Sequence, residues 1–342
     1  MPIRKDSADR PQIERLSPQA AIAGGEIQIR GRGLAPSKTP CVTLGAVPAP
    51  VIIGSDALVI VRVPEGVLEG ELMVANGERS SLSHPCQIGV QIADSMHAVA
   101  NPAVDPKGNV FTTFSGSRGQ KTPVAVYKIA PGGSVTPFVP DLMNATGLAF
   151  DRAGSLYVSS RYDGIVYTAG ADGSLSVYVE GMGIATGLAF DAAENLYLGD
   201  RSGTIFKISR ERQIYVFATL EPSVAAYHLA FGPDGFLYVT GPTTSSFDSV
   251  YRISPGGDSE VFYRGLGRPQ GLAFDAEGYL YVAASLGGRK GIVRIGPESA
   301  PELFLSGPNI VGLAFTPSRS VIVAASHALY RVDVRIKGKA LP

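Results

Sequence analysis

Residues 187–198 read Gly-Leu-Ala-Phe-Asp-Ala-Ala-Glu-Asn-Leu-Tyr-Leu, and variants of this stretch recur along the chain. The fifth residue of each copy falls at position 105, 151, 191, 232, 275 or 316, so that consecutive copies lie 46, 40, 41, 43 and 41 residues apart. The first copy is degenerate, whereas the other five keep most of the pattern. Six copies at a period in the forties predict a repeat architecture.

Each copy is expected to form four short strands. In the copy quoted above, these are residues 188–190, 196–199, 204–208 and 215–218, where branched and aromatic residues alternate with small or polar ones. An Asp-x-x-Gly turn between the first two strands of several copies suits a tight hairpin. A four-stranded sheet cannot bury both of its faces alone, so radial packing of six such sheets predicts a six-bladed β-propeller in an all-β chain.

The way the ring closes can also be predicted. Residues 90–93, Val-Gln-Ile-Ala, precede the first copy and align with the fourth strand at residues 175–179, whereas the last copy lacks a convincing fourth strand. We therefore expect residues 90–93 to complete the sixth blade, which leaves no open edge.

A different unit, without the forty-residue repeat, comes first. Clean alternation at Ile27 and Ile29, and again at Val59, Val61 and Val63, together with short strands between turns, predicts a small β-sandwich. The expected organisation is a frayed N-terminus at residues 1–10, the sandwich at 11–89, the propeller at 90–334 and a tail at 335–342.

Composition narrows the classes of partner and the compartment. The net charge is zero and no basic run occurs, which argues against nucleic acid, and no apolar stretch of 18 residues predicts a membrane span. Residues 1–7 are not followed by the apolar core of a signal peptide, which favours a cytoplasmic location; a periplasmic or surface location would require a removed leader. Cys41 and Cys86 are expected to be buried reduced thiols, with a single bridge as the alternative.

Two family resemblances follow from these motifs. The N-terminal unit carries Ile-x-x-x-Ser-Pro at residues 13–18, Gly-Gly at 24–25, Gly-x-Gly-Leu at 31–34 and Asn-Gly at 76–77, and it resembles the IPT/TIG immunoglobulin-like domain. That resemblance implies a docking or spacing module without catalytic residues. The repeats resemble NHL and SMP-30/gluconolactonase-like six-bladed propellers, while the absence of Trp excludes Trp-Asp repeats.

Deviations from the repeat predict where a ligand would bind. In a four-stranded blade, the first strand begins and the second strand ends on one face, here called the upper face, and the Asp-x-x-Gly hairpins lie on the opposite, hairpin face. Asp151, Asp191 and Asp275 are therefore interpreted as turn residues. The polar residues that register places on the upper face are His97, Asn101, Arg161, Asp200, Arg201, Tyr227, His228, Gln270 and His327.

Several roles are open to this set. Loops and axial channels are polar in any propeller, so each residue could simply serve structure or bind water. As a ligand site, the contacts would come from His97, Asn101, Arg161, Arg201, Gln270 and His327. As a catalytic site, His228 would be a general base beside Tyr227, by analogy with lyases on related propellers.

Resemblance to SMP-30 enzymes would also imply a divalent cation, calcium, zinc or manganese, held in the channel. Asn101, Asp200 and His228 are the ligands that this chain offers. It departs from the family pattern, because Asn101 stands where a Glu of the first blade is wanted and the later blades lack the matching Asn.

Two functions therefore remain in competition. The favoured one is a binding protein that takes a small molecule or a peptide at the axial mouth on the face bearing His97, His228 and His327, with a protein partner on the immunoglobulin-like module. The alternative is a metal-dependent hydrolase, such as a lactonase, or a lyase that uses the same channel.

Overall fold

The computed structural model describes residues 10–36, 38–68, 70–117, 119–245, 247–297 and 300–340. The predicted frayed N-terminus falls, except for its last residue, outside this part, as do the final two residues of the predicted tail. Two compact units are formed, Met1–Val90 with Leu303–Pro308, and Gln91–Glu302 with Asn309–Pro342. The described residues form strands and loops, and among them there is no helix that could cross a membrane.

The N-terminal unit contains two antiparallel sheets around one core. The first has the order β1 (Gln12–Ser17), β3 (Glu26–Arg32), β7 (Leu58–Arg62), β6 (Val51–Gly54). The second has the order β10 (His84–Pro85), β8 (Glu71–Asn76), β4 (Cys41–Leu44), β5 (Val47–Ala49), with β9 (Arg79–Ser80) beside β8. Short strand β2 (Ala20–Ala21) pairs in parallel with β11 (Gln87–Ile88) and with β32 (Glu302–Ser306).

Side chains from both sheets fill this core in the alternation that the sequence predicted. Ile27 and Ile29 point inward from β3, and Val59 and Val61 from β7, where they meet residues of β4 and β8. Burying a branched aliphatic side chain of this size contributes about 1.5–3 kcal/mol. The unit is therefore a β-sandwich held by apolar packing.

Both cysteines of this unit are free thiols. Cys86 is buried, as expected, and burial raises the pKa of its thiol to about 12 with a further contribution from Glu71. Cys41, in contrast, is exposed, so the expectation that both thiols are buried is wrong for this residue. It lies on β4 opposite Ala75, and its side chain points away from the core because the strand alternates.

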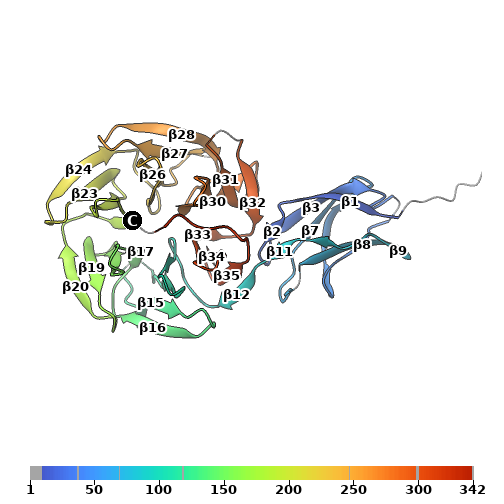
Figure 1. Ribbon diagram of the computed structural model, residues 1–342, viewed down its shortest axis with the longest axis horizontal. Helices are drawn as coiled ribbons and strands as arrows, with labels where there is room; N and C mark the ends of the chain where they lie inside the picture. The colour runs from blue at the N-terminus through green and yellow to red at the C-terminus, as the bar shows by residue number, and fades with distance from the viewer. Residues whose placement is uncertain are drawn as a thin grey trace, which may run out of the picture. The chain divides into compact units, whose positions relative to one another are not determined.

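The second unit is a ring of antiparallel sheets, here called repeat sheets one to six. Figure 1 shows first strands such as β17 (Ala145–Phe150) and β33 (Ile310–Phe315) near the centre. Fourth strands such as β16 (Val135–Pro140), β20 (Leu175–Val179) and β24 (Ile214–Thr219) lie at the perimeter. Sheet one comprises β13 (Ala103–Val104), β14 (Val110–Thr113), β15 (Val124–Ile129) and β16 (Val135–Pro140). Sheet two comprises β17 (Ala145–Phe150), β18 (Leu156–Ser160), β19 (Ile165–Ala169) and β20 (Leu175–Val179).

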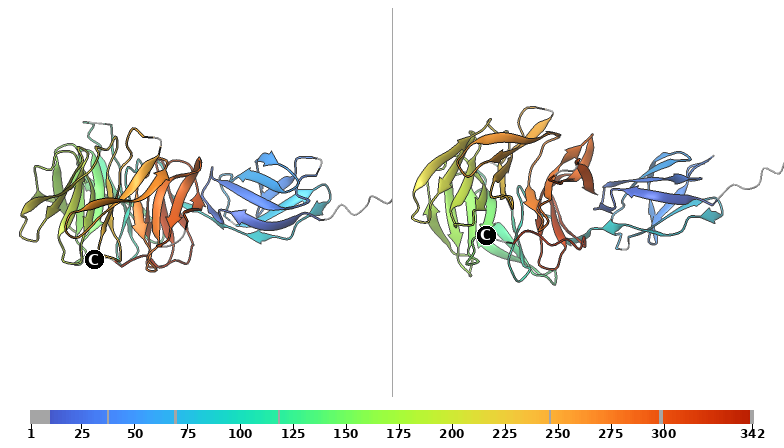
Figure 2. Two further views of the ribbon diagram at one scale, coloured as in Figure 1. Left: turned by 90° about the horizontal axis from the view of Figure 1, so that it is seen from above. Right: turned by 45° about the horizontal axis from the view of Figure 1, so that its top comes forward.

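The remaining repeat sheets follow the same order. Sheet three comprises β21 (Ala185–Phe190), β22 (Leu196–Asp200), β23 (Thr204–Ile208) and β24 (Ile214–Thr219), and sheet four β25 (His228–Phe231), β26 (Leu237–Thr240), β27 (Asp248–Ile253) and β28 (Ser259–Leu266). Sheet five contains β29 (Leu272–Phe274), β30 (Leu280–Leu286) and β31 (Arg289–Ile295), and sheet six contains β33 (Ile310–Phe315), β34 (Val321–Ala325) and β35 (Leu329–Val332). The views of Figure 2 show this ring from two further directions.

Sheet six takes its fourth strand from the beginning of the ring. Strand β12 (Val90–Ala93) lies beside β35, and the order of the sheet is β12-β35-β34-β33. This pairing was predicted from residues 90–93. The outer edge of β35 is thereby covered, which removes an open edge that could pair with another chain.

Aromatic rings join neighbouring repeat sheets. The aromatic residue of a second strand packs edge-to-face on the Phe that ends the first strand of the next sheet. The pairs, with their centroid separations, are Phe111–Phe150 (5.4 Å), Tyr157–Phe190 (4.8 Å), Tyr197–Phe231 (5.0 Å), Tyr238–Phe274 (4.8 Å) and Tyr281–Phe315 (5.1 Å). Such a pair contributes about 0.5–1.5 kcal/mol beyond its burial.

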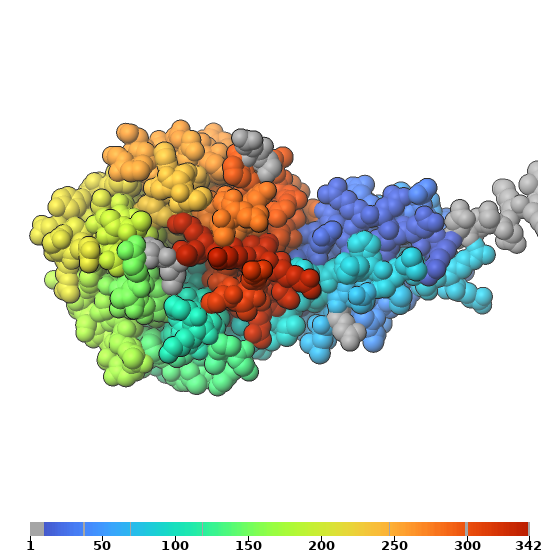
Figure 3. All heavy atoms as spheres, viewed as in Figure 1, coloured from blue at the N-terminus to red at the C-terminus, as the bar shows by residue number. Residues whose placement is uncertain are grey.

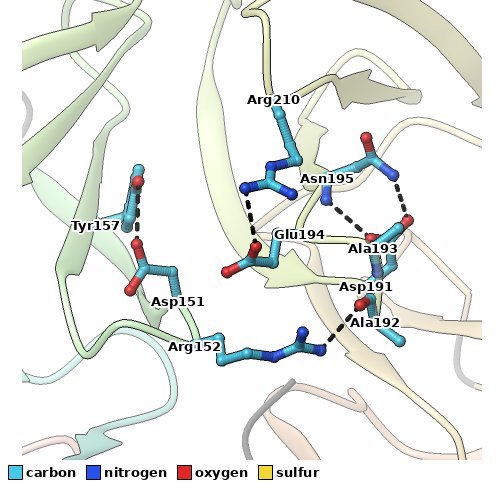
Figure 4. A network of polar contacts seen from close by, with 9 residues as sticks. All are labelled: Asp151, Arg152, Tyr157, Asp191, Ala192, Ala193, Glu194, Asn195 and Arg210. Carbon is cyan, nitrogen blue, oxygen red and sulfur yellow. Dashed lines mark hydrogen bonds and ion pairs between the residues drawn. The ribbon is translucent and has the colours of Figure 1, made fainter.

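The turn between the first two strands is built on an aspartate, as the sequence predicted. Asp191 Oδ1 accepts hydrogen bonds from the backbone N–H of Ala193 (2.9 Å) and Asn195 (2.8 Å), and its Oδ2 accepts from the Asn195 amide (2.8 Å). Figure 4 shows this turn beside the equivalent one, where Tyr157 donates to Asp151, and Arg152 donates across to the carbonyl of Ala192. These carboxylates thus serve the hairpins.

The last described residues cross the hairpin face of the ring. The N–H of Ile336 donates to the carbonyl of Arg319, and the N–H of Lys339 donates to the carbonyl of Phe274. A Cβ on Gly338 would lie 2.3 Å from the Cβ of Phe315, so only glycine fits this contact. The space-filling view shows the red C-terminal segment on the face turned to the viewer (Figure 3). Residues 335–340 are therefore packed on the ring.

Candidate functional site

The innermost strands come closest together at one level of the ring. A Cβ added to Gly147 would lie 2.2 Å from the carbonyl oxygen of Thr186, and one added to Gly187 would lie 2.4 Å from that of Tyr227. The equivalent positions in the other sheets are Asn101, His228, Gly271 and Gly312. Glycine at four of six positions allows this approach, so the two side chains present, Asn101 and His228, occupy the narrowest part of the axis.

The Asn101 side chain bonds to backbone groups of the ring. Its Nδ2 donates to the carbonyl of Leu272 (2.8 Å), and its Oδ1 accepts from the N–H of Leu313 (3.0 Å). These backbone groups belong to the first strands of sheets five and six, whose inner edges face the axis. The amide therefore joins the end of the ring to its beginning and satisfies strand-edge groups that the sheets leave unpaired.

His228 begins β25 and is 3% exposed. Burial lowers the pKa of its imidazole to about 4, because the charged form loses its hydration. Its Nε2 atom is buried and has no hydrogen-bond partner within the protein. At neutral pH the side chain is thus an uncharged imidazole closed off from solvent.

Tyr227, its neighbour, is 2% exposed and also engaged. Its hydroxyl donates to the carbonyl of Glu221, and its backbone N–H donates to the Thr186 hydroxyl (3.1 Å). Desolvation by burial, more than any neighbouring charge, raises the pKa of this phenol well above its ordinary value. The phenol is held in its neutral form and fixed by a backbone acceptor.

Asp200, the carboxylate nominated as a metal ligand, ends β22 at 7% exposure. Its Oδ1 accepts from the N–H of Ile184 (2.8 Å), and its Oδ2 accepts from the Ser202 hydroxyl. The side-chain oxygens of Asn101 and Asp200 thus already accept hydrogen bonds from protein donors. In the described part of the chain, no three His, Cys, Asp or Glu side chains form a group that could hold a metal ion. These residues therefore fit a divalent cation poorly.

Two arginines of the predicted set lie along the loops of the upper face. Arg201 donates from Nε to the carbonyl of Ser223 (3.4 Å) and from Nη2 to that of Val224 (3.1 Å). Arg161 donates from Nη2 to the carbonyl of Gly116 (3.4 Å). Both are half-buried and tie a loop to its neighbour. Gln270 is half-buried as well, and its backbone carbonyl accepts a hydrogen bond from the Thr240 hydroxyl (2.5 Å).

His97 and His327 are exposed and belong to loops that meet. The N–H of Met96 donates to the carbonyl of His327 (2.9 Å), and the N–H of Ser115 donates to that of His97 (3.2 Å). The His97 ring packs edge-to-face on Phe114, with 6.2 Å between centroids. The structure thus brings these two loops together, and it leaves both imidazoles open to solvent.

An axial cavity that the sequence did not suggest lies between Asn101 and the C-terminal segment. It has a volume of about 230 Å³ and is lined by the Leu-Ala-Phe triplets of the first strands, together with Lys339 and Ala340. The Lys339 ammonium donates to the carbonyl of Phe231 (2.8 Å), and desolvation lowers its pKa. Sequence patterns gave no signal here, because residues 335–342 resemble a plain tail.

Asp248 was also missed. It is 3% exposed, its Oδ1 accepts from the N–H (3.0 Å) and hydroxyl (2.7 Å) of Thr243, and its Oδ2 has no partner within the protein. The sequence signal was weak, because this third strand, Asp248–Ile253, also contains the polar residues Ser249 and Arg252.

Comparisons with known proteins bear on the fold. No protein-family model matches the chain, and no curated protein is significantly similar to it. Solved structures match well. A candidate gluconolactonase is similar at 16% identity and a TM-score of 0.61, over 74% of this chain and 94% of that one. The protein is a β-propeller.

Two further structures match nearly the whole chain. An auxiliary nutrient binding protein from Bacteroides ovatus is similar at 11% identity and a TM-score of 0.58, over 97% of this chain and 99% of that one. A catalytically inactive virginiamycin B lyase from Staphylococcus aureus, solved with quinupristin, is similar at 12% identity and a TM-score of 0.52, over 96% of both chains. At such identities the likeness concerns the fold alone, and one propeller fold hosts both binding and catalysis.

Proposed function

We propose that this chain is a non-catalytic binding protein, in which a six-bladed propeller at residues 90–334 takes a small molecule or a peptide. The immunoglobulin-like sandwich at residues 11–89, of the IPT/TIG type, would dock a protein partner or act as a spacer. The six repeat sheets, each starting from one copy of the sequence repeat, support the number of blades.

The burial of the candidate catalytic groups is the observation on which the proposal rests. A general base must come within hydrogen-bond reach of the proton that it abstracts. His228 and Tyr227 are 3% and 2% exposed, and the Tyr227 hydroxyl is bonded to a backbone carbonyl. A substrate on the upper face could touch neither group without a rearrangement of the innermost strands.

The ligand would instead contact the polar groups of the upper face that remain accessible. These are the exposed rings of His97 and His327 and the half-buried side chains of Arg161, Arg201 and Gln270. Cationic and amide donors of this kind suit a ligand rich in hydrogen-bond acceptors. Asn101 would contribute indirectly, since its amide holds the strands that carry these loops.

A panel of metabolites and short peptides, read by thermal shift and then by calorimetry, tests the proposal. We expect a binder whose affinity falls at least tenfold in a His97→Ala/His327→Ala double variant and is unchanged in His84→Ala, a substitution in the N-terminal unit. A ligand that binds the double variant as tightly as the parent protein would contradict the proposed site.

The competing function is a metal-dependent lactonase or a lyase, and the names of two structural neighbours favour keeping it. Asn101, Asp200 and His228 would then bind calcium, zinc or manganese. Elemental mass spectrometry of protein purified without chelator decides between the two. We expect no stoichiometric metal; near-stoichiometric metal that is lost in Asp200→Asn, together with lactone turnover, would replace the binding proposal with the enzyme.

A further inference from the structure

The contact between two neighbouring repeat sheets is here called a seam, and aromatic rings fill the seams from sheet one through to sheet six. In the seam between sheets three and four, Tyr197 packs on Phe231 and also on Phe217 of the fourth strand, with centroids 5.0 and 4.9 Å apart. Sheets two and three are joined in the same way by Tyr157, Tyr178 and Phe190. A second-strand ring, a fourth-strand ring and the first-strand Phe of the next sheet thus form a triad.

The seam between sheets six and one lacks all three rings. Ile322 lies opposite Ala314, as Tyr157 lies opposite Ala149, so it occupies the second-strand position. Val104 occupies the first-strand position, because it pairs with Val110 as Phe150 pairs with Leu156. In the fourth strand, Ile92 precedes Ala93 as Phe217 precedes Ala218. Three aliphatic side chains, which pack in one cluster, therefore replace a triad of rings.

A cavity of about 160 Å³ lies at this seam, and Ile92 and Ile322 form part of its wall. A second observation shows the same missing bulk. A Cβ on Gly173 or Gly257 would lie 1.7 or 2.6 Å from a carbonyl of the preceding sheet, whereas one on Gly133, at the equivalent turn of sheet one, would meet nothing within 4 Å. The neighbouring sheet thus lies farther from this turn than from the turns of sheets two and four.

Arg331 completes the arrangement. It lies opposite Ile322 on the third strand, as Lys128 lies opposite Phe111 and Lys207 opposite Tyr197. Each of those lysines places its ammonium 5.7 Å from the centroid of its ring. Arg331 lines the cavity, and it is held by a hydrogen bond from Nη1 to the carbonyl of Pro131 (3.1 Å). Arg331 thus has the position of the cation that covers a ring in other seams, but the residue opposite it is Ile322.

We propose that this seam is a binding site for a small aromatic compound that carries an anionic group. The ring would replace the missing triad between Ile92 and Ile322, beneath the Arg331 guanidinium. The anion would face Lys107 and Arg331, the two charged residues of the described lining, beside the hydroxyl of Ser318. This site lies on the hairpin side of the ring and is independent of the upper-face ligand site proposed above.

Size and charge both support this class of ligand. Engineered cavities of about 150 Å³ lined by aliphatic and aromatic side chains bind benzene, so the volume suits a single ring. The carboxylate of the nearby Asp105 is not part of the described lining and bonds within its own hairpin, where its Oδ1 accepts from the N–H of Lys107 and Asn109 and its Oδ2 accepts from the Asn109 amide. A ring between aliphatic walls and a guanidinium gains both dispersion and cation–π attraction.

Three probes titrated into the full chain test the site, with calorimetry for affinity and methyl-labelled isoleucine NMR for location. Phenyl phosphate carries ring and charge, benzyl alcohol the ring only, and methyl phosphate the charge only. We expect phenyl phosphate to bind with a dissociation constant on the order of 0.1–1 mM and to shift the Ile92 and Ile322 methyl signals. Benzyl alcohol should bind more weakly, and methyl phosphate should not bind measurably.

Matched variants separate this site from non-specific binding. Ile322→Phe restores the ring that the other seams contain and should abolish binding; if it does not fold, Ile92→Phe fills the cavity from the other wall. Arg331→Gln should weaken phenyl phosphate about tenfold, whereas Lys128→Gln, the equivalent change over a seam that has its own ring, should leave it unchanged. Absence of phenyl phosphate binding, or binding that survives the filling variant, would overturn the proposal.

Discussion

His228 and Asn101 occupy opposite members of a ring of six equivalent positions, and they use the axis differently. Asn101 satisfies two strand-edge groups at once, whereas the buried Nε2 atom of His228 has no partner within the protein. An unpaired polar atom in a dry interior costs roughly 1–3 kcal/mol. His228 thus introduces a buried polar atom without a protein partner at a position that is glycine in four of the six sheets.

Acid should destabilise the protein through His228. Its pKa of about 4 in the folded chain lies below the ordinary 6.5, so between these values the unfolded chain binds a proton that the folded chain does not. Stability should therefore fall as the pH drops from 6.5 to 4, by about 3 kcal/mol in all. Urea denaturation at each pH should show this slope and should lose most of it in His228→Gln. An equal slope in the variant would contradict the assignment.

Removing the Asn101 side chain should loosen the closure of the ring. In Asn101→Ala, the carbonyl of Leu272 and the N–H of Leu313 lose their partner, and we expect a loss of about 2–4 kcal/mol. Asn101→Asp keeps the acceptor for Leu313 but turns a carboxylate oxygen toward the Leu272 carbonyl oxygen, so it should also destabilise the chain. Chemical denaturation measures both, and an Ala variant as stable as the parent would show that water replaces the amide without loss.

At the scale of the element, the hairpins between the first and second strands of sheets two to five are aspartate-centred turns, and a second-strand tyrosine donates to each aspartate. Tyr281 donates to Asp275 Oδ2 (3.0 Å), as Tyr238 donates to Asp234 (2.8 Å). In sheet six, Thr316 and Ile322 replace the pair, and Thr316 bonds to Ser320 in the turn instead. The hairpin and the seam thus change together, because the tyrosine belongs to both.

The turn of sheet five offers the clearest test. Asp275 is 3% exposed, and its Oδ1 accepts from the N–H of Glu277 and Tyr279, both at 2.9 Å. Asp275→Ala should destabilise the chain by about 2–4 kcal/mol, since it leaves these donors and the Tyr281 hydroxyl unpaired. Glu277→Ala, an exposed change in the same turn, should cost under about 0.5 kcal/mol. Equal midpoints of denaturation for the two variants would show that the carboxylate is dispensable.

For the whole ring, two segments from outside the regular repeats complete the structure. Strand β12 supplies the fourth strand of sheet six, and residues 335–340 cross the hairpin face and line the axial cavity. Both join parts of the chain that are distant in sequence. The stability of the ring should therefore depend on contacts made at its two ends.

Displacing the C-terminal segment should open the hairpin face. A Cβ at residue 338 would collide with Phe315, so Gly338→Ala should lower the melting temperature by several degrees and speed release of the last residues by carboxypeptidase. Gly132→Ala, where an added Cβ meets nothing within 4 Å, is the matched control and should match the parent in both assays. Unchanged digestion in Gly338→Ala would mean that Phe315 moves aside easily.

The repeat, the four strands of each copy, the aspartate turns and the closing strand at residues 90–93 could all be predicted, because each follows from patterns within a few residues or from their spacing. The placement of upper-face residues rested on register alone. Register places a residue on a face, but it does not say whether a side chain meets solvent or a backbone carbonyl. For that reason, the sequence could not show that Tyr227 and His228, which were nominated for catalysis, are buried.

The residue pattern alone was enough to assign this protein to an all-β, repeated class, with its period and an extra N-terminal unit. Alternating apolar residues and turn residues determine local structure, so they can be recognised without knowing which distant residues they will contact. The folded chain was needed to show that Asn101 bonds to two first strands, that the C-terminal segment lies on the ring, and that a cavity lies at one seam. These features depend on contacts between residues far apart in the chain, where the size of a single side chain settles whether space is filled.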